Sequence, residues 1–251
     1  IFSSAQEKFS IQGIANEELN NQLLYLCLMD DGERRLAALF DLDGVVLDTE
    51  GQYDHFWSEQ GKRYHPEIPE FNRKIKGQTI DKILEDHFTG NVELQQQILR
   101  ELDEFECKMD YPYVLGVEKF IRVLQKHGVR TALVTSSNNK KMSYVMKAHP
   151  EFTELFERMI TADKITRSKP DPECYLLAAR ELQMEVDACC VFEDSFSGIE
   201  AGSRDGMKVV GLATTNPKEK IQEKVDWVIP DFTGCVYDEF VDLMDKKESI
   251  I

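Results

Sequence analysis

Long apolar segments are missing from this sequence. No run approaches the roughly 20 apolar residues that span a bilayer. The apolar segment Leu23–Met29 is short, has no basic flank before it and has no small-residue cleavage site after it, so it does not resemble a signal peptide. We therefore expect a cytoplasmic protein that does not associate with a membrane.

Cysteine pairs and histidine pairs are also missing. The six cysteines form no C-x-x-C motif, and the five histidines form no H-x-x-x-H pair. Structural zinc sites and disulfide frameworks depend on such clusters. Cys189 and Cys190 are adjacent within an apolar run, as in a buried strand. These observations favour reduced thiols, as in cytosolic proteins, over a zinc site or a disulfide framework.

Basic residues are too few for a general nucleic-acid partner. The chain has 30 basic and 46 acidic residues, which gives a formal net charge of −16. Binding to nucleic acid or to an anionic membrane surface needs a basic face, so we expect neither partner. A small anionic substrate is compatible with this net charge only if a cation and a few local bases neutralise its binding site.

What the sequence does contain indicates a globular protein with an added segment. It has 251 residues, of which 42% are apolar and 30% charged, and this balance predicts a packed core. Residues 1–35 form an N-terminal extension, in which Glu17–Met29 carries an imperfect helical stripe. Two interpretations of this segment stay open: the natural chain begins before Met29, or it begins at Met29 and residues 1–28 are an extension. We expect a monomer, with other oligomeric states left open.

Short apolar runs alternate with helical periodicity along most of the chain. The runs typical of strands are LAALFD (36–41), TALVT (131–135), MITA (159–162), CCVFE (189–193), KVVGLA (208–213) and WVI (227–229). Helical patterns lie between them at 116–127, 138–149, 171–183, 198–205 and 217–223. Strand–helix–strand units of this length predict an α/β fold. We expect a Rossmann-like parallel sheet with helices on both faces, built from residues 36–49 and 112–251.

Residues 50–111 contain no convincing strand. They show helical patterns at 51–60, 79–87 and 92–108, separated by Gly and Pro. Ligands of open α/β sheets bind at the carboxyl ends of the strands. An insertion that leaves the first strand at that end would cover the site as a lid. We therefore expect an inserted α-helical cap over residues 50–111.

Two carboxylates, Asp41 and Asp43, follow the first strand. At this spacing they repel each other unless a cation or a proton lies between them. Gly44 allows a sharp turn with the backbone close to a ligand, and the sequence does not continue as an EF-hand calcium loop. The pair indicates a cation-dependent site, or else a simple acidic turn.

Three further strand ends carry polar residues. One opens a helix with Thr135, Ser136, Ser137 and Asn138. Hydroxyl and backbone N–H groups at a helix start can hold phosphate, although they also serve as ordinary caps. Lys169, in a loop stiffened by two prolines, either neutralises anionic oxygens or is a solvated lysine. Glu193 and Asp194 follow another strand and offer the hard ligands that Mg²⁺ prefers, unless Asp194 only caps the next helix.

Together these motifs resemble a known family. The segments FDLDGVVLDTE, LVTSS, SKPDP and VFEDSFSGIEAG are similar to the four motifs of the haloacid dehalogenase superfamily, a set of phosphotransferases. The resemblance covers residues 36 to about 232, and the position of the insertion resembles the subgroup with an α-helical cap. The DTE continuation, the KGQT cap loop and the EDSFSGI motif resemble the branch of β-phosphoglucomutases and sugar-phosphate phosphatases.

The resemblance implies a role for each matched residue. Asp41 would attack phosphorus and form an aspartyl-phosphate, and Asp43 would act as general acid and base. Thr135 and the N–H of Ser136 would hold the phosphoryl oxygens, while Lys169 would offset charge. The residues implied to bind Mg²⁺ are Asp41, Asp43 (through its backbone carbonyl), Glu193 and Asp194. Because Lys169 alone does not balance these carboxylates, the resemblance implies strict Mg²⁺ dependence.

The resemblance also implies a substrate class. The residues expected to bind substrate are Glu50, Lys76, Gly77, Gln78, Ser136, Ser137 and Asn138. In the mutases an arginine follows the cap loop and a histidine lies early in the first cap helix, but Ile80 and Tyr53 stand at these positions. We therefore expect a Mg²⁺-dependent phosphatase of small phosphorylated metabolites, sugar phosphates above all, with a phosphosugar mutase as the alternative. A non-catalytic phospho-ligand-binding relative is disfavoured because every catalytic position is intact, and a dehalogenase because Asp43 is present.

Overall fold

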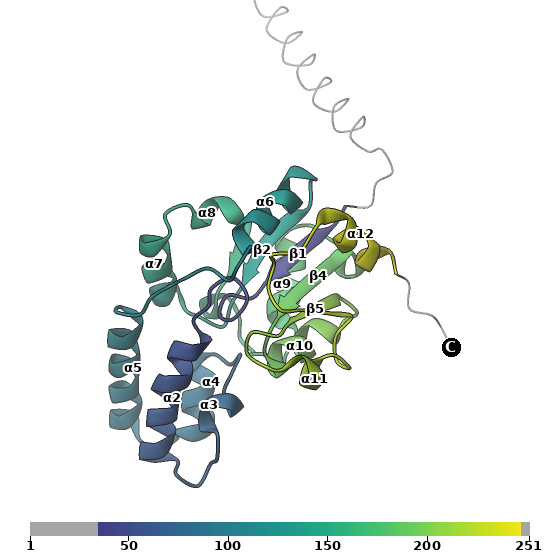
Figure 1. Cartoon of the computed structure of the whole chain (residues 1–251). Helices are drawn as coiled ribbons and strands as arrows, with labels where there is room; N and C mark the ends of the chain where they lie inside the picture. The colour runs from purple at the N-terminus through teal and green to yellow at the C-terminus, as the bar shows by residue number, and fades with distance from the viewer. Residues whose placement is uncertain (1–34, 247–251) are drawn as a thin grey trace, which may run out of the picture. The chain divides into compact units, whose positions relative to one another are not determined.

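The computed structural model describes residues 35–246 of the chain. The expected helix Glu17–Met29 and the alternative start at Met29 lie outside the described residues. Six parallel strands form one sheet in the order β3-β2-β1-β4-β5-β6 (Figure 1). The strands are β1 Ala37–Phe40, β2 Arg130–Val134, β3 Arg158–Ile160, β4 Cys189–Glu193, β5 Lys208–Leu212 and β6 Trp227–Ile229.

β1 lies in the middle of the sheet and pairs with β2 and β4. Its side chains alternate between the two faces: Ala38 and Phe40 join one apolar cluster, and Ala37 and Leu39 join the other. Because both faces are buried, every position of the strand is apolar. The prediction of a Rossmann-like parallel sheet with helices on both faces is confirmed.

Two sets of helices cover the sheet. The Phe40 face packs against α6 Val117–Lys126, α7 Asn139–Ala148, α8 Phe152–Leu155 and α12 Tyr237–Asp245. The Leu39 face packs against α9 Glu173–Glu181, α10 Phe196–Ser203 and α11 Lys218–Ile221. Two 3-10 turns, η1 Ala162–Lys164 and η2 Val186–Ala188, precede α9 and β4 respectively. The sequence patterns did not predict α8, which has only 4 residues, or α12.

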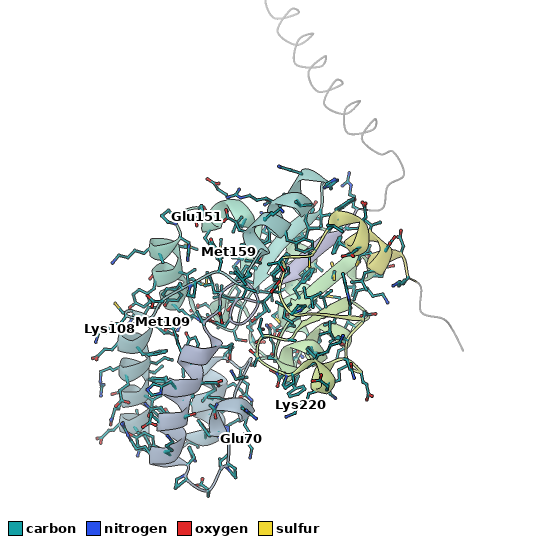
Figure 2. The ribbon with its side chains drawn as sticks, in the orientation of Figure 1. Glu70, Lys108, Met109, Glu151, Met159 and Lys220 are labelled. Atoms are coloured by element: carbon teal, nitrogen blue, oxygen red, sulfur yellow. The ribbon has the colours of Figure 1, made fainter. Side chains whose placement is uncertain are left out.

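A helical insertion separates β1 from β2. It contains α2 Glu50–Tyr64, α3 Phe71–Lys74, α4 Ile80–His87 and α5 Val92–Glu106, which lie together as a bundle (Figure 1). Its helices share an apolar core of their own, which includes Trp57 and Phe71. α2 continues past its expected end at residue 60 to Tyr64. It includes the buried Gly61, where a Cβ would lie only 2.7 Å from the Phe71 Cβ, so glycine allows this close packing. Beyond α5, Met109 packs against the Phe40 face as the chain returns to the sheet (Figure 2).

Two further findings concern the part of the chain that the structure describes. None of the helices within residues 35–246 has the length and hydropathy needed to cross a membrane. The described cysteines are free thiols, at positions Cys107, Cys174, Cys189, Cys190 and Cys235.

Candidate active site

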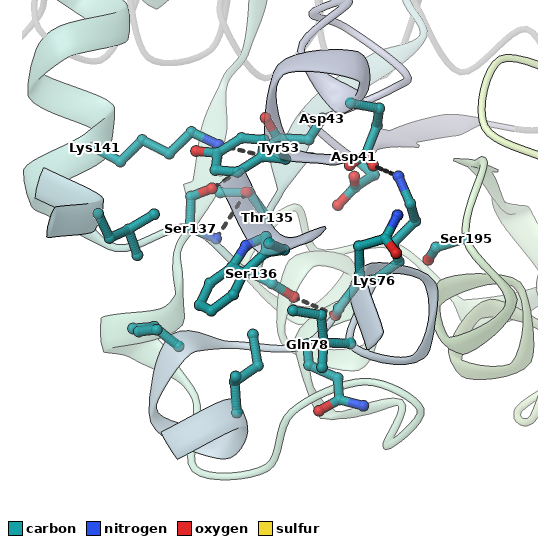
Figure 3. A pocket seen from close by; sticks show the side chains of 18 of the residues that line it. Asp41, Asp43, Tyr53, Lys76, Gln78, Thr135, Ser136, Ser137, Lys141 and Ser195 are labelled. Atoms are coloured by element: carbon teal, nitrogen blue, oxygen red, sulfur yellow. Dashed lines mark hydrogen bonds and ion pairs between the residues drawn. The ribbon is translucent and has the colours of Figure 1, made fainter. Parts of the chain in front are cut away.

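The carboxyl ends of β1 and β2 hold the first site residues in place. The backbone N–H of Asp41 donates to the carbonyl of Phe192 across 3.1 Å, and that of Thr135 donates to the carbonyl of Ile160 across 2.8 Å. The sheet ladder therefore extends one residue past each strand. Both side chains, which are largely buried, point into the same pocket (Figure 3).

Lys169 is the centre of a buried ion-pair cluster. Its Nζ lies 2.6 Å from Asp41 Oδ1 and 2.6 Å from Glu193 Oε1, and its side chain is completely buried. It also donates to the carbonyl of Val134. The interpretation of Lys169 as a solvated loop lysine is wrong, because the loop turns the side chain under the strand ends.

Glu193 is held by several hydrogen bonds. Besides Lys169, its carboxylate accepts from the hydroxyl of Tyr175 at 2.8 Å and from the backbone N–H groups of Asp194 and Ser195. Gly198 leaves it room, since a Cβ there would lie 1.7 Å from Oε1. The carboxylate is therefore fixed in position and orientation. The sequence did not predict Tyr175 as a site residue, because it lies within a helical pattern that is typical of a buried core helix.

Three carboxylates lie together at this edge of the sheet. Asp41, Glu193 and Asp194 each offer an oxygen, and these oxygens lie within 4.8 Å of one another. Burial raises the pKa of Asp41 to about 7, with Lys169 opposing this and Glu193 adding to it. Burial likewise raises the pKa of Asp194 well above its usual range. The cluster thus favours protons or a cation, and its hard oxygen donors fit Mg²⁺.

Helix capping does not occupy Asp194. Ser195 is the N-cap of α10, and its side chain accepts from the N–H of Gly198. The side chain of Asp194 instead accepts from Thr215, and its carbonyl accepts from Asn216 at 2.9 Å. The capping interpretation of Asp194 is wrong, and its carboxylate faces the pocket.

Asp43 has its own set of donors, separate from the three carboxylates. Its Oδ2 accepts from Lys141 Nζ at 2.5 Å and from the Ser137 hydroxyl at 3.2 Å (Figure 3). Its Oδ1 accepts from the Thr49 hydroxyl at 2.5 Å. Lys141, whose side chain is only 3% exposed, is not among the site residues that the sequence predicted. The available signal was its position in the first turn of α7, three residues after the N-cap Asn138 that follows β2.

The residues that follow β2 form hydrogen bonds within the protein and also line the pocket. Asn138 is the N-cap of α7, so the capping interpretation is correct for this side chain. Thr135 Oγ1 accepts from the N–H of Ser137 at 3.0 Å. The hydroxyl of Ser136 donates to the carbonyl of Gly77 at 2.7 Å. All four residues line the pocket, so the backbone of this turn remains positioned for an anion.

The cap loop is fastened to the core by three serine hydroxyls. Besides Ser136, Ser197 donates to the carbonyl of Lys76 at 2.8 Å, and Ser168 accepts from the N–H of Thr79 at 2.9 Å. Gly77 makes this approach possible, because its φ is +77° and a Cβ would lie 2.3 Å from the Ser197 oxygen. These bonds hold the cap loop against the strand ends, where it lines the pocket.

Three of the residues expected to bind substrate from the cap side interact within the protein. Lys76 forms ion pairs with Glu50 and with Asp54, the latter at 3.0 Å. Gln78 donates through its side chain to the carbonyl of Lys74 at 3.2 Å. Glu50, Lys76 and Gln78 do line the pocket, but the two charged groups neutralise each other there.

Sequence comparisons identify the family of the chain. The chain belongs to the haloacid dehalogenase-like hydrolase family, whose family model matches residues 38–212. It is 30% identical to a validoxylamine A 7'-phosphate phosphatase of Streptomyces hygroscopicus over 78% of this chain and 94% of that protein. It is also 26% identical to a β-phosphoglucomutase of Bacillus subtilis over 72% of this chain and 84% of that protein. The haloacid dehalogenase resemblance, including its β-phosphoglucomutase branch, is confirmed.

A solved structure shows the same fold. A HAD hydrolase of family IA, variant 3, from Entamoeba histolytica superposes with a TM-score of 0.72 at 23% identity. The match covers 84% of this chain and all of that chain. At this level of identity the likeness supports the fold alone.

Proposed function

We propose that this protein is a Mg²⁺-dependent phosphatase of small phosphorylated metabolites, sugar monophosphates in particular. One observation carries the proposal: the Asp41 carboxylate, held by Lys169 at the end of β1, faces a pocket and lies beside two further carboxylates, those of Glu193 and Asp194. The relationship to a phosphatase and to a phosphosugar enzyme supports the substrate class.

The first step forms a covalent intermediate. A carboxylate oxygen of Asp41 bonds to phosphorus while the ester bond between phosphorus and the leaving oxygen breaks. Asp43 supplies the proton that the leaving oxygen needs. Thr135 and the N–H of Ser136 hold the phosphoryl oxygens, and Lys169 keeps the Asp41 carboxylate oriented.

The second step releases phosphate. Asp43, now a carboxylate, takes a proton from a water molecule as that water attacks phosphorus. The bond between phosphorus and Asp41 breaks, so Asp41 returns to its starting form. Asp41, Glu193, Asp194 and the Asp43 carbonyl would hold the metal. When bound, Mg²⁺ offsets the negative charge of the carboxylates and of the phosphoryl group.

A phosphosugar mutase is the alternative function, and product analysis separates the two. Purified protein is incubated with β-glucose 1-phosphate, Mg²⁺ and a trace of glucose 1,6-bisphosphate, and glucose 6-phosphate and free phosphate are followed together. A phosphatase releases phosphate without accumulating glucose 6-phosphate. Rapid formation of glucose 6-phosphate with little phosphate would show a mutase, whereas no reaction calls for a panel of other monoesters before the activity is rejected.

The remaining expectations concern location and assembly. We propose a cytoplasmic protein, which the free thiols of the described residues support, and we propose that it is a monomer. Fractionation of the source cells and light scattering of the purified protein would test the two statements separately.

A further inference from the structure

A second cleft lies at the boundary between the cap and the core. The cap wall includes Glu70, Arg73 and Lys74, at and within α3, and the core wall includes Phe196 of α10 and Lys220 of α11. Figure 2 labels Glu70 and Lys220 on the two sides of this boundary. The cleft has a volume of about 520 Å³, whereas the active-site pocket has about 110 Å³. Ligand-binding clefts usually measure ~300–1,000 Å³, so this cleft has room for a larger ligand than the pocket.

An ion pair separates the cleft from the active-site pocket. Lys76 and Asp54 lie 3.0 Å apart, and both residues line both spaces. The side chain of Lys76 is only 12% exposed and also pairs with Glu50. The charged groups at the boundary therefore already bind each other, and a ligand of the cleft has to be held by other residues.

The cleft has unpaired positive charge on both walls. Each carboxylate of its lining has a basic partner: Asp54 pairs with Lys76, Glu70 with Arg73, and Glu200 with Arg204. Within residues 35–246, neither Lys74 nor Lys220 has a carboxylate partner. Although the chain as a whole has a net charge of −16, this cleft thus presents two available ammonium groups. They favour an anionic ligand.

The other donors of the core wall are already used within the protein. Ser197 donates to the carbonyl of Lys76 at 2.8 Å. Thr215 donates to the carboxylate of Asp194, and the amide of Asn216 donates to its carbonyl at 2.9 Å. Recognition of the anion therefore depends on the two lysines.

Phe196 adds a flat apolar surface to the core wall. It is the first residue of α10 and is 44% exposed, although it lines the cleft. Nucleobases stack on exposed aromatic side chains, and phosphate groups bind ammonium groups. An aromatic ring beside unpaired lysines consequently matches a ligand that combines a flat ring with a phosphate.

We propose that this cleft binds a nucleotide, with its base against Phe196 and its phosphate bound by Lys74 of the cap and Lys220 of the core. Such a ligand contacts the cap and the core at once, so its binding favours the arrangement of the two that the structure shows. The site is separate from the active-site pocket, and the proposal does not depend on which ester the protein hydrolyses.

Calorimetry of the full chain with AMP and with ADP, in EDTA, tests the site without turnover. EDTA removes the metal ion, without which the carboxylates of the active site repel an anion. We expect saturable binding of one nucleotide per chain, with a Kd at least about 5-fold higher in Lys74→Met and in Lys220→Met. Binding of neither nucleotide would overturn the proposal, and a loss in only one of these variants would overturn the contact with both walls.

A neighbouring lysine provides the control. Lys218 belongs to the same short helix as Lys220 and is exposed, but it does not line the cleft. Lys218→Met should leave the Kd within about twofold of the wild-type value. Equal Kd values for Lys218→Met and Lys220→Met would mean that Lys220 does not bind the phosphate.

A pair of ligands tests the stacking on Phe196. AMP and ribose 5-phosphate share a ribose and a phosphate, but only AMP has a base. We expect the wild-type protein to bind AMP at least about 5-fold more tightly than ribose 5-phosphate, and Phe196→Ala to reduce this preference to within about twofold. If Phe196→Ala keeps the preference, the base does not stack on this ring and the ligand class is wrong.

An active-site variant shows where the nucleotide binds. Thr135 lines the active-site pocket but not the cleft, so Thr135→Val should leave the Kd for AMP within about twofold. Weaker binding in Thr135→Val together with unchanged binding in Lys220→Met would place the nucleotide in the active site and overturn the proposal. Because these measurements need no turnover, failure of this proposal and failure of the proposed phosphatase function are distinguishable.

Discussion

Lys141 of the core donates to Asp43 across 2.5 Å, at the place where the cap meets the strand ends. The same ammonium group lies over the ring of Tyr53, which belongs to cap helix α2. The hydroxyl of Tyr53 donates to buried Glu106 of α5 at 2.8 Å. One chain of contacts thus links the two long helices of the cap to the proposed general acid and base.

Replacing Lys141 should damage turnover more than binding. Lys141→Met keeps the length of the side chain but leaves Asp43 with only its hydroxyl donors, so we expect kcat to fall about 100-fold with a smaller change in KM. Lys141→Arg should restore part of the loss because it keeps the charge. Steady-state kinetics that separate kcat from KM are the measurement.

The neighbouring lysine provides the control. Lys140 is 62% exposed and pairs with Asp103 at 2.7 Å, away from Asp43. Lys140→Met should therefore change kcat by less than about twofold. A Lys141→Met enzyme with the same small effect would mean that Lys141 only packs against the site.

The sequence predicted the part of the site that depends on strand register. Asp41, Thr135 and Glu193 could be placed together because each ends or follows an apolar run, and parallel strands end at one edge. It could not predict which side chains share a hydrogen bond across the cap boundary. The Ser136 hydroxyl, for example, donates to the carbonyl of Gly77 across this boundary, and within the cap Lys76 pairs with Glu50. Such pairings depend on tertiary distances that local patterns do not contain.

Asp41→Asn should abolish turnover without unfolding the protein. An amide cannot form the phosphoryl-enzyme bond, so we expect kcat to fall by about 10⁴-fold or more. Lys169 keeps Glu193 as a partner at 2.6 Å, so the buried ammonium group is not left unpaired. Circular dichroism and kinetics of the same preparation are the test, and a near-native rate would refute the assignment of Asp41 as nucleophile.

The same variant should change how stability depends on pH. Burial raises the pKa of Asp41 to about 7, whereas an aspartate in an unfolded chain titrates near pH ~4. Between these values the folded state binds the proton more tightly, so this group lowers the stability of the metal-free protein as pH rises. In EDTA, the melting temperature of the wild type relative to Asp41→Asn should fall from pH 5 to pH 8. Parallel curves would contradict the raised pKa.

A single methyl group in the cap loop should prevent closure. In Gly77→Ala the new Cβ would lie 2.3 Å from the Ser197 oxygen and 2.6 Å from the Ser195 oxygen, at a φ of +77°. We expect kcat/KM to fall at least about 10-fold because the loop can no longer reach its serine partners.

Gly90→Ala is the matched control: it has a φ of +84°, but its Cβ would meet nothing within 4 Å. Both variants carry the cost of a left-handed alanine, about 1–2 kcal/mol, so only the clash distinguishes them. Equal kcat/KM values for the two variants would show that loop closure is not needed.

Metal removal should stop the reaction and destabilise the folded protein. Asp41, Glu193 and Asp194 place three carboxylates within 4.8 Å, and Lys169 supplies one buried positive charge among them. Bound Mg²⁺ relieves their repulsion, so we expect it to raise the melting temperature and EDTA to abolish phosphate release.

Asp194→Asn should lose most of the Mg²⁺-dependent thermal shift, while Asp48→Asn, at an exposed aspartate of the same loop as Asp43, should retain it. Since the thermal shift needs no substrate, it tests the cation site even if the physiological substrate is not among those tried. Undiminished turnover in EDTA, or an unchanged shift in Asp194→Asn, would show that the three carboxylates do not hold the metal.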